Sequence, residues 1–382
     1  MEVTVPYPSL FNALSYPFVA ILAVLHWKRL LYVTTRDIPL LILLGTALAS
    51  VIWSADLSMT MAGNRGLVRT FVFGIYFASR YTLKDQMKII GWVCAIAAVL
   101  SLAVGVVLPN YGIGEDGWLG IFPYKNYLAR SMALGGILFL VLALNYRKQR
   151  WLGWIGLALT VTLILLSRSA SILIILFFFV SLMPLYQLIK QPYRIKVILL
   201  SLTTVLTSGA ALLVANSLEF ILVDLLDKDL LFNGRIPVWH LVIEKSLDKL
   251  WLGYGYNAFW SSDAGVDVIV NSWASDRGII PESFNAHNGY LEVLSQLGLW
   301  GILIYVIVIC TVFFKTFILL AGTKQVKYFW VFQCLVFLFL TSVADVGSNL
   351  LSTNFYGTFG IGLCLSIALE YQRATRKKII SR

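Results

Sequence analysis

The sequence is poor in charge and in the residues from which many soluble enzymes build their sites. Only 13% of its 382 residues are charged and three are histidine, whereas 59% are hydrophobic. A soluble domain of this length could not bury so much apolar surface. The four cysteines show neither metal-ligand spacing nor the pattern of a disulfide framework. We expect Cys94, Cys310, Cys334 and Cys364 to pack as small hydrophobic side chains.

The short motifs of nucleotide-binding and hydrolytic enzymes are also missing. The chain contains no P-loop, no G-x-S-x-G elbow, no H-E-x-x-H zinc motif and no dinucleotide fingerprint. One D-x-D triplet, Asp227-Lys228-Asp229, has the pattern with which nucleotide-sugar glycosyltransferases bind a metal. No further acidic cluster accompanies it, so we expect neither a metal nor a cofactor.

Long apolar runs are abundant instead. Their length suits helices that cross a bilayer, which predicts an all-α integral membrane protein with about eleven transmembrane helices. The eleven runs are residues 8–26, 38–54, 66–82, 88–108, 127–146, 151–167, 170–189, 195–216, 290–320, 328–346 and 355–371.

The positions of lysine and arginine predict the orientation of these helices. A cytoplasmic C-terminus puts most of the 30 basic residues in short inside segments, as the positive-inside rule requires. These segments are residues 27–37, 80–88, 147–150, 190–196, 315–327 and the C-terminal tail. The N-terminus then lies outside, and Glu2 without a basic neighbour does not resemble a signal peptide. We attribute the net charge of +11 to contact with anionic membrane lipid and expect no nucleic-acid partner.

This topology divides the chain into three parts. Residues 1–216 form an N-terminal transmembrane bundle of about eight helices, residues 217–286 an external loop, and residues 287–382 about three C-terminal helices with a basic cytoplasmic tail. The loop is rich in leucine and aromatic residues, which is not typical of disorder. It predicts two amphipathic helices at the membrane interface, one over Leu218–Asp227 and one from Pro237. Trp239, Val242, Ile243, Leu247 and Leu250 line the apolar face of the second.

His287 is the strongest candidate for chemistry, because it stands where the external loop enters an apolar helix. A histidine pKa near 6.5 suits proton transfer at neutral pH. Asn285 and Asn288 flank it and could orient the ring or cap the helix, and Tyr290 shares its helical face. The alternative is a buried histidine satisfied by a backbone carbonyl. The other two histidines, His26 and His240, are expected at the interface.

Several cations are candidates for binding an anion. Arg235 precedes a predicted helix start, where an arginine beside free backbone N–H groups suits a phosphate. Arg168 lies in a short external hairpin and could hold a lipid diphosphate. Lys125 and Asn126 offer a point charge and an amide near the same face. Lipid-headgroup anchoring for Arg235 and snorkelling for Arg168 remain open alternatives.

Arg69 lies one turn inside a predicted span, where an arginine needs a polar cavity or a partner. Its alternative role is structural, through the corner at Trp53-Ser54-Ala55-Asp56.

Taken in order along the chain, several segments resemble the bacterial O-antigen ligase and polysaccharide polymerase superfamily, and within it the exopolysaccharide production proteins of the succinoglycan type. They are Trp53-Ser54-Ala55-Asp56, Trp118-Leu119-Gly120-Ile121-Phe122 with Lys125-Asn126, Leu165-Leu166-Ser167-Arg168-Ser169, Gly234-Arg235 with Trp239, Leu252-Gly253-Tyr254-Gly255, and His287-Asn288-Gly289-Tyr290-Leu291 with Gly298 and Gly301. One departure is Pro123-Tyr124, where the family often has Gly-His before the lysine–asparagine pair.

The resemblance implies a metal-independent, inverting membrane glycosyltransferase of GT-C-type architecture. Its donor would be an oligosaccharide on undecaprenyl diphosphate at the external face of the plasma membrane, and its acceptor a glycan or glycolipid. By the same resemblance His287 looks like the base that activates the acceptor hydroxyl, and Arg235 and Arg168 look like diphosphate-binding arginines. A flippase and a chain-length regulator would be further partners.

Three functions stay open. A polymerase is favoured over a ligase that moves glycan to a lipid or protein. A polymerase must hold two lipid diphosphates, and Lys125, Arg130, Lys245, Lys249 and Arg277 could supply a second basic patch. A transporter of a lipid-linked sugar or small anion is less favoured, because Glu292, Asp345 and Glu370 lie at span ends rather than mid-span.

The predicted topology can be tested with reporter fusions. A reporter fused after Asp263 should report an external location, and one fused after Lys324 a cytoplasmic location. Opposite signals from the two fusions would place His287 in the cytoplasm and contradict the expected external donor.

Overall fold

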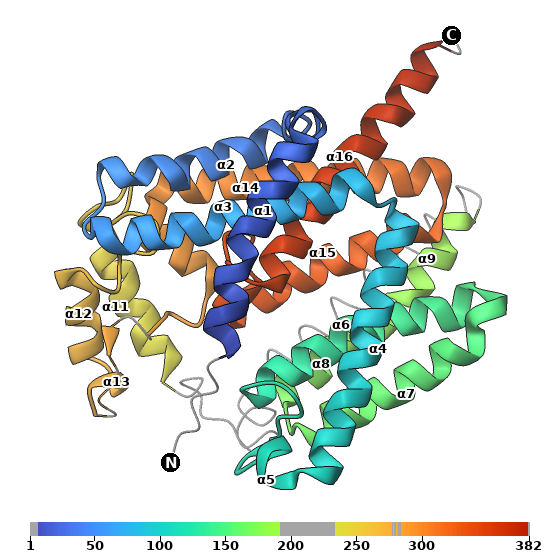
Figure 1. The fold of residues 1–382 in the computed structure, drawn as a ribbon, viewed down its shortest axis with the longest axis horizontal. Helices are drawn as coiled ribbons and strands as arrows, with labels where there is room; N and C mark the ends of the chain where they lie inside the picture. Colours follow the sequence, from blue (N-terminus) through green and yellow to red (C-terminus); the bar gives the residue numbers. More distant parts are fainter. Residues whose placement is uncertain (1–6, 192–233, 277, 279, 282–283, 381–382) are drawn as a thin grey trace. The chain divides into compact units, whose positions relative to one another are not determined.

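The computed structural model describes residues 7–191, 234–276, 278, 280, 281 and 284–380, and in this part the chain is almost entirely helical (Figure 1). A single strand pair occurs there, in which β1 (Ile113–Gly114) runs antiparallel to β2 (Gly117–Trp118). The prediction of an all-α membrane protein is confirmed. The amphipathic helix predicted over 218–227, the span predicted over 195–216 and the D-x-D triplet lie outside the described residues.

Seven helices of the described part are long and apolar enough to cross a membrane. They are Leu14–Thr34, Leu83–Val107, Lys125–Asn145, Arg147–Leu166, Ser171–Ile189, Gly289–Thr323 and Val326–Val343. Three further predicted runs form helices that are too short or not apolar enough to be counted as membrane spans. The run 38–54 is divided between α2 (Ile38–Ala49) and η1 (Ser50–Ile52), 66–82 lies in α3 (Leu57–Arg80), and 355–371 lies in α16 (Phe355–Ile380). The predicted count of eleven is therefore not confirmed.

The chain folds as two compact units, and the first combines residues 1–81, 231–315 and 338–382. In it α3 packs against α1 (Tyr7–Thr34) and against α16. The absence of a side chain at Gly74 permits this approach, since a Cβ there would lie 2.6 Å from Ile361 of α16. A partly buried ion pair adds to the unit, because the Lys315 ammonium lies 2.8 Å from the buried Asp37 carboxylate that caps α2.

The second unit comprises residues 82–230 and 316–337. Its central helix is α6 (Lys125–Asn145), which packs against α4 (Leu83–Val107), α7 (Arg150–Leu166) and α8 (Ala170–Ser181). Glycines of α7 lie directly on α6, in the manner of small-residue interfaces between membrane helices. Gly153 meets the backbone of Ala143, and Gly156 meets the ring of Phe139. The unit also contains α5 (Pro109–Gly112), η2 (Arg147–Gln149) and α9 (Met183–Lys190).

The segment from residue 234 to 286 builds an apolar core of its own within the first unit. It carries α11 (Arg235–Leu247), α12 (Asp263–Val270) and α13 (Trp273–Asp276), which lie beside one another (Figure 1). The helix predicted from Pro237 is confirmed as α11, but its buried residues are Val238, Val242 and Ser246. Ile243 and Leu247, predicted on the same apolar face as Val242, are 45% and 61% exposed. The buried face of α11 differs from the predicted one because the helix packs on Phe259 and Trp260. The sequence pattern does not show where these two residues lie.

A break in α14 (Gly289–Thr323) joins this segment to the membrane helices of the first unit. Gly298 has a φ of +65°, which interrupts the helix and frees backbone groups on either side. The chain from Leu250 to Gly255 satisfies them, with Leu299 N–H donating to the Leu250 carbonyl at 2.8 Å and Tyr254 N–H to the Ser295 carbonyl at 2.9 Å. A Cβ at Gly298 would overlap the Trp251 backbone. The glycine therefore permits the close contact between α14 and the chain from Leu250 to Gly255.

The remaining elements complete the first unit. They are α15 (Val326–Ala344), which begins in the second unit and ends in the first, and η5 (Val346–Ser348), the short turn that follows it.

Candidate functional site

His287 lies in a turn that two asparagines shape. The Asn288 side-chain oxygen accepts the N–H groups of Tyr290 at 3.0 Å and Leu291 at 3.3 Å, which caps the start of α14. The Asn285 side-chain oxygen accepts the His287 N–H at 2.9 Å. His287 itself has a φ of +50°, an uncommon backbone conformation for a residue with a side chain. The asparagines thus hold the backbone of His287, and its ring is half-buried.

The carboxylate of Glu292 fixes the residues just before His287. One oxygen accepts the Ala286 N–H at 2.8 Å and the Trp260 indole N–H at 2.9 Å, and the other accepts the Gln296 amide at 2.8 Å. Glu292 is only 4% exposed, so each bond forms in a setting of low polarity, where hydrogen bonds to a charged group are strong. Glu292 is therefore a positioning residue, which ties the His287 turn to the core around Trp260.

Arg235 reaches the surroundings of His287 from α11. Gly234, at φ +78°, comes directly before the helix, and Arg235 is its first residue. The Trp239 indole N–H donates to the Ala286 carbonyl at 2.7 Å, which fastens the first turns of α11 to the His287 segment. The structure therefore brings together two residues that are 52 positions apart in the sequence and that the sequence analysis had selected separately.

The charges around His287 act on its pKa in opposite directions. Burial lowers the pKa of His287 below 6.5, and the nearby Arg235 guanidinium lowers it further, because both disfavour the imidazolium. The Asp345 carboxylate raises the pKa of His287 and so opposes part of this effect. Burial also lowers the pKa of Arg235, again against Asp345. His287 is thus held mainly as the neutral imidazole, the form that can accept a proton.

Asp345 is a member of this group that the sequence analysis did not select. It follows α15, and its carboxylate accepts the Gly347 N–H at 2.6 Å at the start of η5. Sequence reasoning recorded it only as an acid at a span end. Its proximity to His287 depends on the packing of α15 and α14, which no local motif reveals.

Two of the supporting residues predicted from sequence have structural contacts. The Tyr290 hydroxyl donates to the Phe339 carbonyl at 2.9 Å, and its ring packs edge-on against Tyr305. The Arg69 guanidinium donates to Ser15 at 3.2 Å and lies 5.0 Å from the centre of the Tyr16 ring. The expected tie of Arg69 to the corner at Trp53–Asp56 is wrong: Asp56 caps α3 through the Met59 N–H, and Arg69 lies three helical turns further along.

The other predicted residues belong to the second unit and gather there. Arg168 lies exposed in the turn between α7 and α8, with a φ of +52°. The next residue, Ser169, donates to the Asn126 side-chain oxygen at 3.3 Å, which sets the Arg168 turn beside the start of α6. Lys125 donates to the Asp116 carbonyl at 3.2 Å and lies 3.8 Å from its carboxylate. The Ser169 contact thus brings the Arg168 turn close to Asn126, and Lys125 is the residue before Asn126 at the start of α6.

The three bonds to Glu292 predict a large effect of its removal. Glu292→Ala leaves the buried Ala286 and Trp260 donors without an acceptor, at about 1–3 kcal/mol each. Its thermal midpoint in detergent should therefore fall clearly below that of wild type, with Glu292→Gln between the two. Glu244→Ala, an exposed acid on α11, is the matched control and should melt as wild type. Equal midpoints for Glu292→Ala and Glu244→Ala would contradict the role of this carboxylate.

The part of the chain that carries these residues is similar to known proteins. Residues 127–306 match the profile of the O-antigen ligase family, a range that contains Arg168, Arg235 and His287. The chain is also 24% identical over 276 residues to the exopolysaccharide production protein ExoQ of Rhizobium meliloti strain 1021. That alignment covers 70% of this chain and 62% of the relative, so the chain spans less than two thirds of the relative's length. These two matches agree with the ordered motifs and the helical membrane fold, and they support the resemblance of the chain to the O-antigen ligase and polysaccharide polymerase superfamily.

Proposed function

We propose that this protein is a membrane glycosyltransferase that polymerises oligosaccharides carried on undecaprenyl diphosphate. The observation that carries the proposal is the half-buried His287, held beside Arg235 and Asp345 at the start of α14. The family match and the relative named for exopolysaccharide production support the same chemistry. The donor would be used at the external face of the plasma membrane, with the C-terminus in the cytoplasm.

The arrangement provides for each charge that the reaction creates. The acceptor hydroxyl attacks the anomeric carbon of the donor, and the bond from that carbon to the diphosphate oxygen breaks with its electron pair. Neutral His287 takes the hydroxyl proton, a contribution worth roughly 10²–10⁴-fold in rate. Asp345 stabilises the imidazolium that results. Arg235 and the N-terminal N–H groups of α11 would stabilise the charge on the leaving diphosphate, so that direct displacement with inversion needs no metal.

Arg168 is proposed as a second diphosphate-binding arginine on the strength of the resemblance. Its exposed position beside Lys125 and Asn126 is compatible with an anionic ligand. Its role is independent of the geometry around His287, so substitution of Arg168 alone tests it.

The basic patch that favoured polymerase over ligase is weaker than the sequence suggested. The Lys245 ammonium lies 2.6 Å from the Asp267 carboxylate and is not a free cation. Arg130 is 2% exposed and packs over the Tyr127 ring, and Arg277 lies outside the described residues. The preference for polymerase therefore rests on the similarity to the exopolysaccharide production protein. A ligase that transfers glycan to a lipid or protein acceptor would use the same site.

A transporter of a lipid-linked sugar is the candidate from another class. Ion-coupled transport through a bundle usually depends on carboxylates that can load and release a cation. Glu292 is engaged by three donors, and Asp37 is paired with Lys315. Both are occupied by structural partners, which favours the enzyme.

Substitution of the site residues tests the proposed chemistry. His287→Ala should abolish glycan transfer while the purified protein remains monodisperse, and His240→Ala, at an exposed position on α11, should retain transfer. Arg235→Lys and Arg168→Lys should each weaken transfer strongly, because lysine cannot bind a diphosphate bidentately. Substantial turnover by His287→Ala would remove it as the base, and wild-type rates in the lysine variants would indicate lipid anchoring.

The opposing effects of Arg235 and Asp345 predict opposite shifts of the pH profile. As the pH falls, kcat/KM should decline at the pKa of His287 in the free enzyme, because protonation removes the base. Arg235→Gln removes a positive neighbour and should move this decline to higher pH. Asp345→Asn removes a negative neighbour and should move it to lower pH. Shifts in the same direction would show that another group controls the profile.

A further inference from the structure

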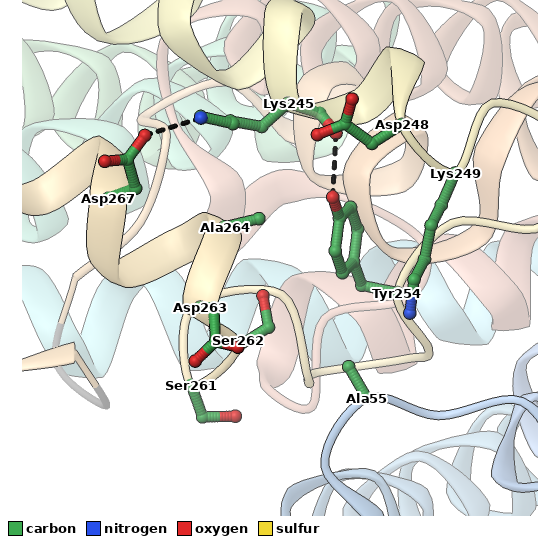
Figure 2. Close-up of a pocket in the computed structure, with 10 residues that line it drawn as sticks. All are labelled: Ala55, Lys245, Asp248, Lys249, Tyr254, Ser261, Ser262, Asp263, Ala264 and Asp267. Atoms are coloured by element: carbon green, nitrogen blue, oxygen red, sulfur yellow. Dashed lines mark hydrogen bonds and ion pairs between the residues drawn. The ribbon is translucent and has the colours of Figure 1, made fainter.

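A polar cavity of about 480 Å³ opens between α11, α12 and the chain that precedes α3, within the first unit (Figure 2). Its wall includes Lys245 from α11, Asp248 and Lys249 from the turn that follows it, and Asp263, Ala264 and Asp267 from α12. None of these residues takes part in the chemistry proposed for His287. The cavity is therefore a second feature of the external segment that needs its own explanation.

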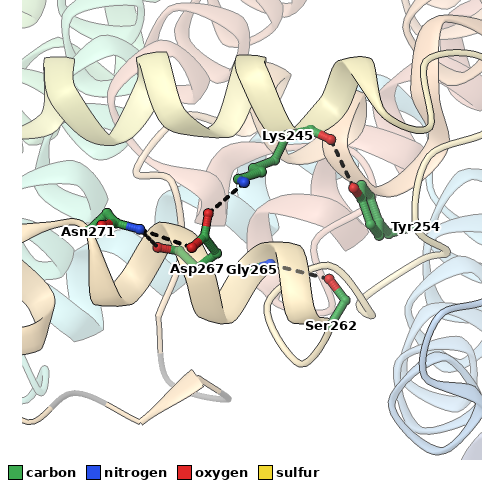
Figure 3. A network of polar contacts seen from close by, with 6 residues as sticks. All are labelled: Lys245, Tyr254, Ser262, Gly265, Asp267 and Asn271. Atoms are coloured by element: carbon green, nitrogen blue, oxygen red, sulfur yellow. Dashed lines mark hydrogen bonds and ion pairs between the residues drawn. The ribbon is translucent and has the colours of Figure 1, made fainter.

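The charge of the cavity does not suit a diphosphate. Its wall has two lysines and three aspartates, which leaves one net negative charge. Lys245 is paired with Asp267 at 2.6 Å, and Asp267 also accepts the Asn271 amide at 3.0 Å (Figure 3). The Lys249 ammonium lies 4.7 Å from the centre of the Tyr254 ring. Both cations thus have partners within the protein, so a polyanion would find little free positive charge there.

The remaining groups suit the hydroxyls of a sugar. Within the described residues no hydrogen bond or ion pair engages the side-chain carboxylates of Asp248 and Asp263, which are exposed. A sugar hydroxyl can donate to such a carboxylate and accept from the Lys249 ammonium at the same time. Ala264 adds a small apolar surface between these groups, against which the carbon face of a sugar ring can pack.

The walls are fixed before any ligand arrives. The Tyr254 hydroxyl donates to the Lys245 carbonyl at 2.9 Å, and the Ser262 hydroxyl accepts the Gly265 N–H at 3.3 Å at the start of α12 (Figure 3). A Cβ at Gly265 would overlap the Phe259 carbonyl, so α12 lies directly on the apolar core beneath the cavity. Such a preformed site loses little conformational entropy when it binds.

The position of the cavity on α11 sets which sugar it could hold. Arg235 begins α11 and Lys245 lies ten residues further along the same helix. At about 1.5 Å per residue the two positions are separated by roughly 15 Å along the helix axis. A sugar bonded directly to a diphosphate at Arg235 could not reach the cavity, whereas a later sugar of the same oligosaccharide could.

We propose that this cavity is a binding subsite for an uncharged sugar of the glycan, several units away from the reacting end. The subsite rests on the proposed function and deepens it: it would let the enzyme select a complete repeat unit over a truncated one. Binding energy from the distal sugar would act on recognition of the glycan and leave the transfer step at His287 unchanged.

Filling the cavity tests the proposal. Ala264→Trp should obstruct it, and Val270→Trp, at an exposed position on the same helix and outside the cavity, is the matched control. We expect Ala264→Trp to raise KM for a lipid-linked donor with the complete repeat unit by about tenfold or more, the equivalent of one lost hydrogen bond to a charged group. Its kinetics with a donor that carries only the first sugar should match those of wild type.

A second variant guards against a folding defect in Ala264→Trp. Asp248→Asn with Asp263→Asn keeps the shape of the cavity and removes both unengaged carboxylates, and it should raise the same KM selectively. Unchanged KM for the complete repeat in both variants would overturn the proposal, as would equal increases for the complete and truncated donors.

A binding measurement separates this proposal from the proposed function. Neutral oligosaccharides from partial hydrolysis of the host's own exopolysaccharide serve as the probe, observed by saturation-transfer NMR with the full-length protein in nanodiscs. Wild type and Val270→Trp should bind them, and Ala264→Trp should not. Binding that persists in Ala264→Trp contradicts the subsite. Absence of turnover with every lipid-linked donor, alongside cavity-dependent binding, would instead contradict the proposed function.

Discussion

The buried carboxylate of Glu292 is the contact on which the candidate site depends. It accepts hydrogen bonds from a backbone N–H before His287, from the indole of Trp260 and from Gln296 on its own helix. A single side chain therefore holds the His287 turn, the apolar core of the segment 234–286 and the start of α14 in one arrangement. The break at Gly298 continues this connection, since the chain around Leu250–Gly255 supplies the hydrogen bonds that α14 loses there.

Within that frame, the site balances opposite charges around one imidazole. Burial and Arg235 favour neutral His287, whereas Asp345 favours its protonated form. A general base needs both influences, because it must be unprotonated before the reaction and tolerably stable once it has taken the proton. The same Arg235 that keeps the base neutral is the proposed partner of the leaving diphosphate. Its charge would thus keep His287 free to accept the proton and favour the departure of the diphosphate.

Sequence reasoning identified the parts of this site that depend on local chemistry. The loop-to-helix transition singled out His287, and Pro237 indicated a helix start next to Arg235, which is observed as α11. Asp345 was missed because its closeness to His287 arises only from the packing of distant helices. The apolar face of α11 was predicted wrongly for the same reason, because the side of the helix that is buried depends on its packing against Phe259 and Trp260. Lys245 was counted as a free cation because its partner, Asp267, lies on another helix.

The central claim is that this chain alone transfers a glycan from one lipid diphosphate to another. The direct measurement uses purified protein in nanodiscs with the lipid-linked repeat unit and a chelator, followed by mass spectrometry of the lipids. The account predicts longer lipid-linked glycans and, for every bond formed, one molecule of undecaprenyl diphosphate released. Recovery of the lipid-linked repeat unit unchanged, with no lipid diphosphate released, would contradict it.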